Sequence, residues 1–319
     1  MNENGSHRGA GIADPRKLAR LDAARERVAA RLGTAPRFDP AKLARLQPAR
    51  DRLAARMDPN SGWFVDRRVH GEEILTVSGL SIRFGGLQAL DQVAVVARTG
   101  EVTGVIGPNG AGKTTFFNCV SGLYAPDSGE ITYEGRPLRG SVVSRGRLGL
   151  GRTFQTPRLF ASLSVLDNLL LGCAVAGATG RPYQFEPSLL RLALPERAER
   201  IARIVGFRGD LRQPAGGLSF GDLRVVEFAR ALCAAPRVLM LDEPASGLDT
   251  ERAGDLVRLL RRLADLGLAI LLIEHDMSFV MGLCDTITVL DFGTVLAQGT
   301  PTEVQTNEAV IEAYLGRSA

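Results

Sequence analysis

The most informative stretch of the chain reads Gly107-Pro108-Asn109-Gly110-Ala111-Gly112-Lys113-Thr114, with Thr115 after it. It fits the pattern GxxxxGK[ST], follows the apolar run 102–106 and precedes residues 115–120, which we expect to be helical. Glycines let backbone N–H groups turn inward around an anion, and the start of a helix adds partial positive charge. The stretch therefore predicts a loop that binds phosphate groups.

Two side chains of this loop are expected to carry its chemistry. Lys113 would reach the β- and γ-phosphates of a nucleoside triphosphate, and the Thr114 hydroxyl would bind Mg²⁺. Lys113 is the only lysine after residue 70, in a chain rich in arginine. That fits a position where a compact ammonium serves and a planar guanidinium does not. The motif alone leaves kinases, GTPases, helicases and transporter ATPases open.

Two adjacent carboxylates, Asp242 and Glu243, follow a second apolar run at 238–241. A carboxylate at the end of a buried strand beside a phosphate loop can hold Mg²⁺, and its neighbour can polarise an attacking water molecule. The pair therefore predicts a metal ligand at Asp242 and a catalytic residue at Glu243.

Short apolar runs predict strands at 74–77, 80–84, 93–96 and 102–106. Strands and helices then alternate to about residue 295, which is typical of an α/β fold with a mainly parallel sheet. A mainly helical stretch at about 165–234 interrupts the strands. Near the end, Thr300-Pro301-Thr302-Glu303 is a capping box that predicts one terminal helix running to about Leu315.

Composition narrows the class of protein. The chain has 319 residues, 45% of them hydrophobic, which allows one or two domains with a packed core. No stretch approaches the roughly 18 to 20 apolar residues that span a bilayer, and residues 1–14 contain no apolar signal region. We therefore expect a cytoplasmic protein. Scattered cysteines without a CxxC pair predict small buried side chains rather than zinc ligands or disulfides: Cys119, Cys173, Cys233 and Cys284.

The first 70 residues differ from the rest and are expected to form a basic extension before a domain at 71–319. They carry fifteen Lys and Arg against eight Asp and Glu, so the pI of the whole chain is no argument for DNA binding. Residues 14–33 and 39–58 form a repeat, each copy opening with Asp-Pro, and predict two amphipathic helices. Two interpretations stay open: a partly disordered product of duplication, or a segment that docks on an acidic membrane surface or a partner subunit.

A third motif, Leu218-Ser219-Phe220-Gly221-Asp222-Leu223-Arg224, resembles the signature motif of ABC ATPases. In that family the motif acts in trans, so the resemblance implies that Ser219 and Gly221 contact the γ-phosphate held by the opposite subunit. The chain departs from the commonest form at Phe220, Asp222 and Leu223. Asp222 suits the helix dipole, and we expect Arg224 to offset its charge near a phosphate.

Other positions match the family in its order along the chain. The resemblance implies that Phe84 stacks on adenine, that Gln155 touches Mg²⁺ and senses the membrane subunits, and that His275 contacts the γ-phosphate. It also implies that the loop Ser246-Gly247-Leu248-Asp249 crosses the dimer interface. Taken alone, Phe84 could instead pack in the core, and a lone histidine such as His275 would more often be structural.

The resemblance covers about residues 72–317. Within the family the chain looks most like the ATPases of branched-chain amino-acid importers, on stretches such as Arg152-Thr153-Phe154-Gln155. It implies a P-loop NTPase core with a mainly parallel sheet, a small antiparallel β subdomain and a helical subdomain at about 160–235. It also implies ATP and Mg²⁺ as cofactors and Glu243 as the residue that polarises water.

The implied partners are a second ABC ATPase subunit, in a homo- or heterodimer, transmembrane permease subunits and, indirectly, an extracytoplasmic solute-binding protein. The location would be peripheral, on the inner face of the plasma membrane, and no nucleic acid is implied. Two other functions stay open: a non-transport ABC ATPase in translation or DNA repair, and a regulatory module that uses ATP only as a switch. The transported substrate is expected to be a branched-chain or other amino acid, with urea, amides or small carboxylates as the alternatives.

Overall fold

A computed structural model describes residues 71–315. The predicted extension 1–70, with its repeat at 14–33 and 39–58, lies outside the described residues, so the division of the chain at residue 70 stays a prediction. The strands are β1 (Glu73–Phe84), β2 (Leu87–Arg98), β3 (Val102–Ile106), β4 (Ser128–Tyr133), β5 (Arg136–Pro137), β6 (Leu150–Arg152), β7 (Val238–Asp242), β8 (Ala269–Ile273), β9 (Thr286–Asp291) and β10 (Thr294–Gly299).

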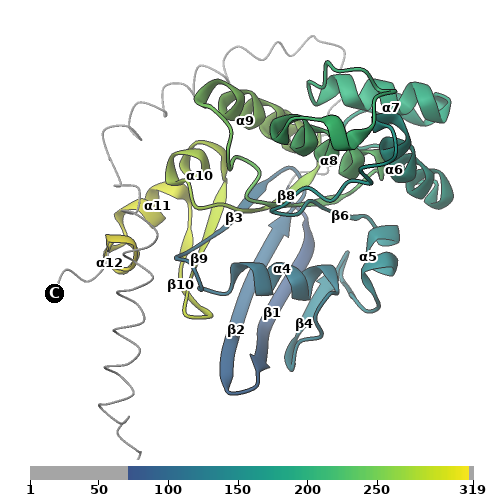
Figure 1. Ribbon diagram of the computed structural model, residues 1–319. Coiled ribbons are helices and arrows are strands. Elements are labelled where there is room, and N and C mark those ends of the chain that lie inside the picture. Colours follow the sequence, from purple (N-terminus) through teal and green to yellow (C-terminus); the bar gives the residue numbers. More distant parts are fainter. Residues whose placement is uncertain (1–70, 316–319) are drawn as a thin grey trace, which may run out of the picture. The chain divides into compact units, whose positions relative to one another are not determined.

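Helices connect and flank these strands (Figure 1). The helices are α4 (Lys113–Ser121), α5 (Val142–Leu148), α6 (Val165–Thr179), α7 (Leu194–Ile204), α8 (Phe220–Cys233), α9 (Thr250–Asp265), α10 (Met277–Leu283), α11 (Pro301–Thr306) and α12 (Glu308–Leu315), with 3₁₀ turns η2 (Pro187–Arg191) and η3 (Ala215–Gly217). In this described part of the chain, no helix combines the length and the apolar character needed to cross a membrane.

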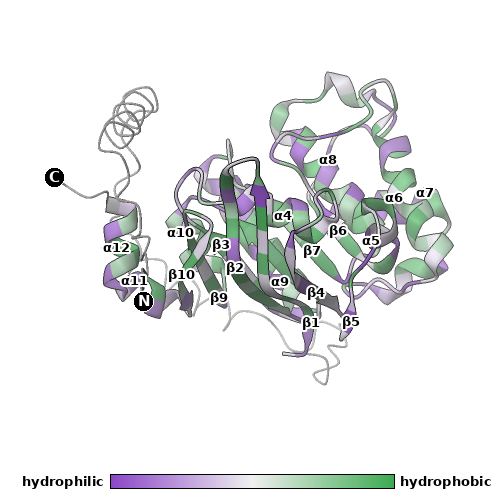
Figure 2. Ribbon diagram, turned by 90° about the horizontal axis from the view of Figure 1, so that it is seen from below, coloured by the Kyte–Doolittle hydropathy of each residue, from purple (hydrophilic) through white to green (hydrophobic). Residues whose placement is uncertain are grey.

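The larger sheet has the strand order β10-β9-β3-β8-β7-β6. All neighbours in it are parallel except β10, which runs antiparallel to β9. Every residue of β3, β7 and β8 is buried, as expected for parallel strands covered on both faces. Hydrophobic residues accordingly concentrate on the central strands (Figure 2). The predicted α/β fold with a mainly parallel sheet is confirmed.

The smaller sheet is antiparallel, in the order β2-β1-β4-β5. The expected strands 74–77 and 80–84 are one continuous strand, β1, because the chain passes through Gly79 as an irregularity in the pairing with β2 rather than as a turn. Gly79 has a φ of 60°, which glycine adopts without steric cost. The expected strand 93–96 is likewise the inner part of the longer β2.

Helix α4 joins the two sheets in one hydrophobic core. Its side chains Phe116 and Phe117 are fully buried in a cluster that also contains residues of β1, β2, β3 and β8. The helix begins at Lys113, two residues before the expected start, because Gly112 of the phosphate loop is its N-cap. The phosphate loop is therefore attached directly to a helix that is buried in the hydrophobic core.

Helices α6, α7 and α8 gather beside the sheets in the stretch that was expected to be helical (Figure 1). The buried Tyr183 hydroxyl donates to the carbonyl of Cys233 at 2.8 Å and ties the segment after α6 to the end of α8. All four cysteines are buried, as predicted.

The C-terminal prediction is partly wrong. The capping box is present: Thr300 Oγ1 accepts from Glu303 N, and Glu303 Oε2 accepts from Thr300 N at 2.7 Å. The expected single helix is two, however, because Asn307 adopts φ −75° and ψ 118° and ends α11. Its Oδ1 then accepts from Val310 N at 3.2 Å, so this residue starts α12 with a capping bond of its own.

Candidate active site

The predicted site residues meet because the parallel strands β3, β7 and β8 end at one edge of the larger sheet. Val105 of β3 and Asp242 of β7 both pair with Ile273 of β8. The phosphate loop after β3, Glu243 after β7 and His275 after β8 therefore leave the sheet at the same level. Carboxyl ends of parallel strands are where ligands bind in such folds.

The phosphate loop depends on two of its glycines. Gly107 has a φ of 151°, and a Cβ there would lie 2.1 Å from the Leu290 carbonyl oxygen. Gly112 has a φ of 101°, and its Cβ would lie 2.7 Å from the Ala89 carbonyl oxygen. No side chain caps the first N–H groups of α4, so they face outward as an anion-binding helix start. Between these glycines lie the remaining predicted loop residues, Pro108, Asn109, Gly110 and Ala111.

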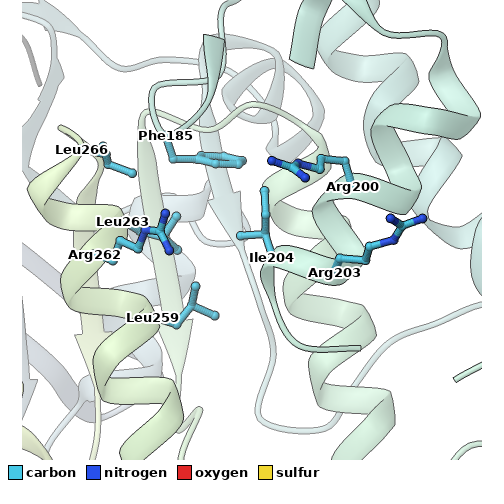
Figure 3. A pocket seen from close by; sticks show the side chains of 8 residues that line it. All are labelled: Phe185, Arg200, Arg203, Ile204, Leu259, Arg262, Leu263 and Leu266. Carbon is cyan, nitrogen blue, oxygen red and sulfur yellow. The ribbon is translucent and has the colours of Figure 1, made fainter. Parts of the chain in front are cut away.

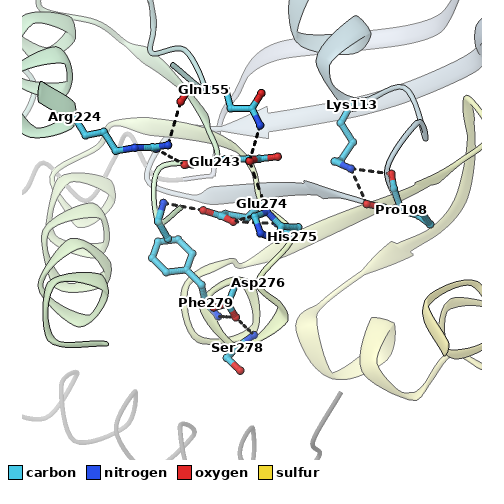
Figure 4. Close-up of polar contacts among 12 residues, drawn as sticks. Pro108, Lys113, Gln155, Arg224, Glu243, Glu274, His275, Asp276, Ser278 and Phe279 are labelled. Carbon is cyan, nitrogen blue, oxygen red and sulfur yellow. Dashed lines mark hydrogen bonds and ion pairs between the residues drawn. The ribbon is translucent and has the colours of Figure 1, made fainter. Parts of the chain in front are cut away.

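Lys113 is folded into this loop. Its Nζ donates to the carbonyls of Gly107 at 2.7 Å and Pro108 at 2.9 Å (Figure 4). Burial lowers the pKa of Lys113, and the nearby carboxylates of Glu243 and Asp242 raise it. The ammonium is thus held beside the loop and the carboxylate pair. When a phosphate group binds, Lys113 would donate to its anionic oxygens in place of the two carbonyls. After it, Thr114 is exposed and Thr115 is half-buried.

Asp242 is buried at the end of β7, with 4% exposure. Burial raises its pKa, and Arg152, whose Nη2 lies 3.4 Å from Oδ2, lowers it. Arg152 also donates to Asn118 Oδ1 at 2.8 Å and Ser121 Oγ at 2.6 Å, and its guanidinium lies 4.8 Å from the Phe154 ring centroid. We gave Arg152 no role from sequence, although its place just before Gln155 was a usable signal.

Glu243, Gln155 and His275 come together as predicted partners of one site (Figure 4). Gln155 Nε2 donates to Glu243 Oε2 at 2.9 Å, and His275 Nδ1 lies 3.8 Å from the same oxygen. The Glu243 backbone has a φ of 49°, in the left-handed region that is costly for residues other than glycine. Such strained residues cluster at functional sites, and this one carries the proposed catalytic carboxylate.

Gln155, Glu243 and His275 meet at what we call the catalytic corner. Sequence reasoning missed Glu274, a buried carboxylate whose hydrogen bonds hold this corner together. It is 1% exposed and accepts from Ala245 N at 2.8 Å and His275 N at 3.0 Å (Figure 4). Burial raises its pKa, and the backbone donors lower it. Glu274 therefore ties the chain after Glu243 to the chain that carries His275. Its signal was a charged residue directly after an apolar strand.

The signature motif lies at the start of α8, and its serine is the N-cap. Ser219 Oγ accepts from Asp222 N at 3.2 Å and donates to Asp222 Oδ2 at 2.8 Å. The expectation that Arg224 offsets Asp222 is wrong: Arg224 donates to the carbonyls of Glu243 and Gln155 instead. The Arg224 guanidinium also lies over the Phe220 ring, 4.9 Å from its centroid.

The remaining predicted residues lie around this centre. Asp249 is exposed and caps α9 through Arg252 N at 2.8 Å. The loop that contains it passes beside α8, since a Cβ on Gly247 would lie 3.6 Å from the Phe220 ring. Gly221 is close to Arg252, whose Nη1 would lie 2.8 Å from a Cβ there. Phe84 is 45% exposed and meets Tyr124 edge-on, with ring centroids 5.3 Å apart, so it is no core residue and has a face open to solvent.

Two cavities lie beside α9, one lined also by α7 and the other by both α7 and α8. The smaller, of about 230 Å³, has an apolar floor and an arginine rim (Figure 3). Its lining residues are Phe185, Arg200, Arg203, Ile204, Leu259, Arg262, Leu263 and Leu266. The larger, of about 730 Å³, shares Arg203, Ile204 and Leu259 with it and extends to Gly221 and Arg224 of the signature helix. This side of the helical group is hollowed toward the core.

Comparisons with known proteins agree with this geometry. A family model described as ABC transporter matches residues 90–246, and one described as branched-chain amino acid ATP-binding cassette transporter matches residues 294–319. The chain is similar to the high-affinity branched-chain amino acid transport ATP-binding protein LivG of Salmonella typhimurium, with 42% identity over 77% of this chain and 99% of that protein. For the protein BraF of Pseudomonas aeruginosa the identity is 40%, over 77% of this chain and 98% of that protein.

Solved structures give the same result. A nucleotide-free ATP-binding cassette from an ABC transporter is 29% identical, with a TM-score of 0.66 over 77% of this chain and 100% of that one. The ADP conformation of MJ1267, an ATP-binding cassette of an ABC transporter, is 30% identical, with a TM-score of 0.66 and the same coverage.

Proposed function

Because this chain belongs to the family of ABC transporter ATP-binding proteins, we propose that it hydrolyses ATP to drive an importer for branched-chain or closely related amino acids. The observation that carries the proposal is the corner where Gln155, Glu243 and His275 meet beside the phosphate loop. A role in translation or DNA repair is set aside, since the similar proteins named above serve transport.

The residues present divide the work of phosphoryl transfer. Lys113 and the start of α4 bind the β- and γ-phosphates, and Phe84 offers its open face to adenine. Glu243 accepts a proton from the attacking water molecule, and His275 stabilises charge near the γ-phosphate. Such sites act mainly by positioning and by neutralising charge, which these groups supply. An intact Glu243 and His275 favour a hydrolysing subunit over a module that uses ATP only as a switch.

Magnesium is the cofactor that fits the donors beside the loop. Thr114, Gln155 and Asp242 would hold it, and it would neutralise charge on the phosphate oxygens. A buried carboxylate with a raised pKa, as at Asp242, gains from a cation beside it. Among residues 71–315 no group of three or more His, Cys, Asp or Glu could hold a metal ion. Mg²⁺ needs only one or two protein carboxylates and takes its other ligands from water and phosphate oxygens.

A second ATPase subunit, identical or different, would complete the site. Ser219 and Gly221 lie at the start of α8, where Ser219 bonds with Asp222 and not with the phosphate loop of its own chain. The helix start would bind the γ-phosphate of the partner's ATP through the physics that serves α4. ATP would then lie between the two subunits.

Membrane permease subunits are the partners that Gln155 and the helices α6 to α8 would sense. The cavity in Figure 3 is a candidate docking surface for a permease helix, because its apolar floor and arginine rim suit an amphipathic segment with acidic residues. The chain would lie peripherally on the inner face of the membrane. A solute-binding protein would act on it only through the permeases.

The test is the variant Glu243→Gln in the purified chain. We expect ATP binding to be retained, turnover to fall by roughly a hundredfold or more, and the closed dimer to accumulate. Turnover equal to that of the wild type would rule out Glu243 as the residue that activates water.

A further inference from the structure

We propose that Arg224 is a positioning residue that holds the backbone of Glu243 and of Gln155 to the signature helix α8. The position of this helix then determines where Glu243 and Gln155 lie in the active site. The proposal rests on the proposed function, because it assumes that Glu243 activates the attacking water molecule.

The contacts of Arg224 reach two separate segments. Nη1 donates to the Glu243 carbonyl at 2.5 Å, and Nη2 donates to the Gln155 carbonyl at 3.1 Å (Figure 4). The side chains of Glu243 and Gln155 are themselves joined at 2.9 Å. One guanidinium thus closes a ring of hydrogen bonds through both residues, and its planar fork suits two carbonyls better than an ammonium would.

The bond to Glu243 falls where the backbone most needs support. Glu243 has a φ of 49°, a conformation that a residue with a side chain keeps only when its surroundings fix it. Its N–H is held by the Ile273 carbonyl at 2.9 Å. Arg224 holds the carbonyl on the other side of the residue, through a charge-assisted bond. The direction of the carboxylate therefore depends on both anchors.

A second residue of the same helix face, Glu227, accepts hydrogen bonds from the loop that contains Gln155. Glu227, one turn after Arg224, accepts from Arg158 N at 2.8 Å and from Phe154 N at 3.4 Å, and is 3% exposed. Residues three apart on a helix lie on one side of it. The segment 154–158 is therefore fastened to α8 at both ends by Glu227 and in between by Arg224.

The start of α8 is the part that would meet the partner's nucleotide. Phe220, in its first turn, stacks on the Arg224 guanidinium with the ring centroid 4.9 Å away, and also lies beside Gly247. A shift of this helix start would move Arg224 and, through it, the Glu243 carbonyl. Occupancy of one nucleotide site would in this way reach the catalytic carboxylate of the other.

The experiment compares the purified full-length variants Arg224→Met and Arg224→Lys with the wild type and with Glu243→Gln. Arg258→Met is the matched control, because Arg258 is an exposed arginine of α9 whose one ion pair within residues 71–315 is with Asp255. ATPase turnover, the KM for ATP and the equilibrium affinity for ATP are measured, together with the midpoint of thermal unfolding.

We expect Arg224→Met to lower kcat by about ten- to a hundredfold while the affinity for ATP changes by less than about threefold. Arg224→Lys can make one bond of the two and should recover part of the loss. Arg258→Met should match the wild type. Unchanged kcat in a folded Arg224→Met protein would overturn the proposal, and so would equal losses of kcat, ATP affinity and thermal stability, which indicate a purely structural role.

If Arg224→Met does not fold, Arg224→Lys decides: kcat equal to that of the wild type overturns the proposal, and a fall in kcat alone supports it. Glu243→Gln separates the two levels of inference. Normal turnover in Glu243→Gln contradicts the proposed function itself, whereas an inactive Glu243→Gln beside a fully active Arg224→Met contradicts only the role of Arg224.

Discussion

Gln155 donates its side-chain amide to the Glu243 carboxylate at 2.9 Å, although 88 residues separate the two in sequence. The oxygen that would accept a proton from water is thus already engaged by the residue that would sense the membrane subunits. Movement of the Gln155 loop would change what this carboxylate can do. The contact offers a direct physical link between permease docking and hydrolysis.

The first prediction concerns this link. Gln155→Ala should lower the basal turnover of the isolated chain by about tenfold, since it removes a proposed Mg²⁺ ligand and the donor to Glu243 but leaves the Glu243 carboxylate and Lys113 in place. It should abolish most of the stimulation of turnover by reconstituted permease subunits and transported substrate, because the connecting bond is gone. The ratio of stimulated to basal turnover is the quantity to measure. A ratio equal to that of the wild type would contradict the link.

The second prediction concerns pH. Arg152 lowers the pKa of Asp242, so Arg152→Met should let burial raise this pKa further. The carboxylate would then become protonated at a higher pH than in the wild type. The acid limb of the profile of kcat against pH should therefore shift to higher pH. Removing one partner of a buried ion pair should also cost about 3 kcal/mol of unfolding free energy.

The control for the pH shift is Arg261→Met, which removes an arginine paired with Asp285 away from the catalytic corner. It should lower stability without moving the acid limb. An acid limb that stays in place in Arg152→Met would mean that Asp242 does not govern it.

The third prediction concerns the departure of the signature motif at Asp222. Because Ser219 donates its hydroxyl to Asp222 at 2.8 Å, Asp222→Ala should free this hydroxyl and remove a negative charge from the phosphate-binding helix start. In the Glu243→Gln background, half-maximal dimer formation should need several-fold less ATP. The lost interaction with the helix dipole should cost no more than about 1 kcal/mol. Weaker dimer formation would show that Asp222 strengthens, rather than weakens, the binding of the partner's ATP at the start of α8.

Much of the fold followed from the sequence because its signals are local. The apolar runs at 102–106 and 238–241 predicted β3 and β7, and the motif around Gly112 and Lys113 predicted the phosphate loop. The shared site of Glu243 and His275 was implied by the family resemblance, and the common edge of the parallel strands explains why the two residues meet.

What the sequence could not predict are contacts between distant segments. Asp222 stands two positions from Arg224 and was the natural partner by proximity, yet the guanidinium reaches Glu243 and Gln155 across the tertiary structure. Glu274 and Arg152 were passed over because their positions, after an apolar strand and before Gln155, indicate nearness to the site but not which groups a buried charge contacts. The break at Asn307 was missed because one residue can both end a helix and cap the next.

In the proposed mechanism, each nucleotide is bound by the phosphate loop of one subunit and by Ser219 and Gly221 of the other. Turnover is measured at saturating Mg²⁺ and ATP in a protein that carries Ser219→Ala and Gly221→Val in every subunit, with ATP binding verified in parallel. We expect intact ATP binding with turnover reduced by about a hundredfold or more, because each phosphate loop lacks the helix start of the opposite subunit. Turnover close to that of the wild type would contradict this mechanism.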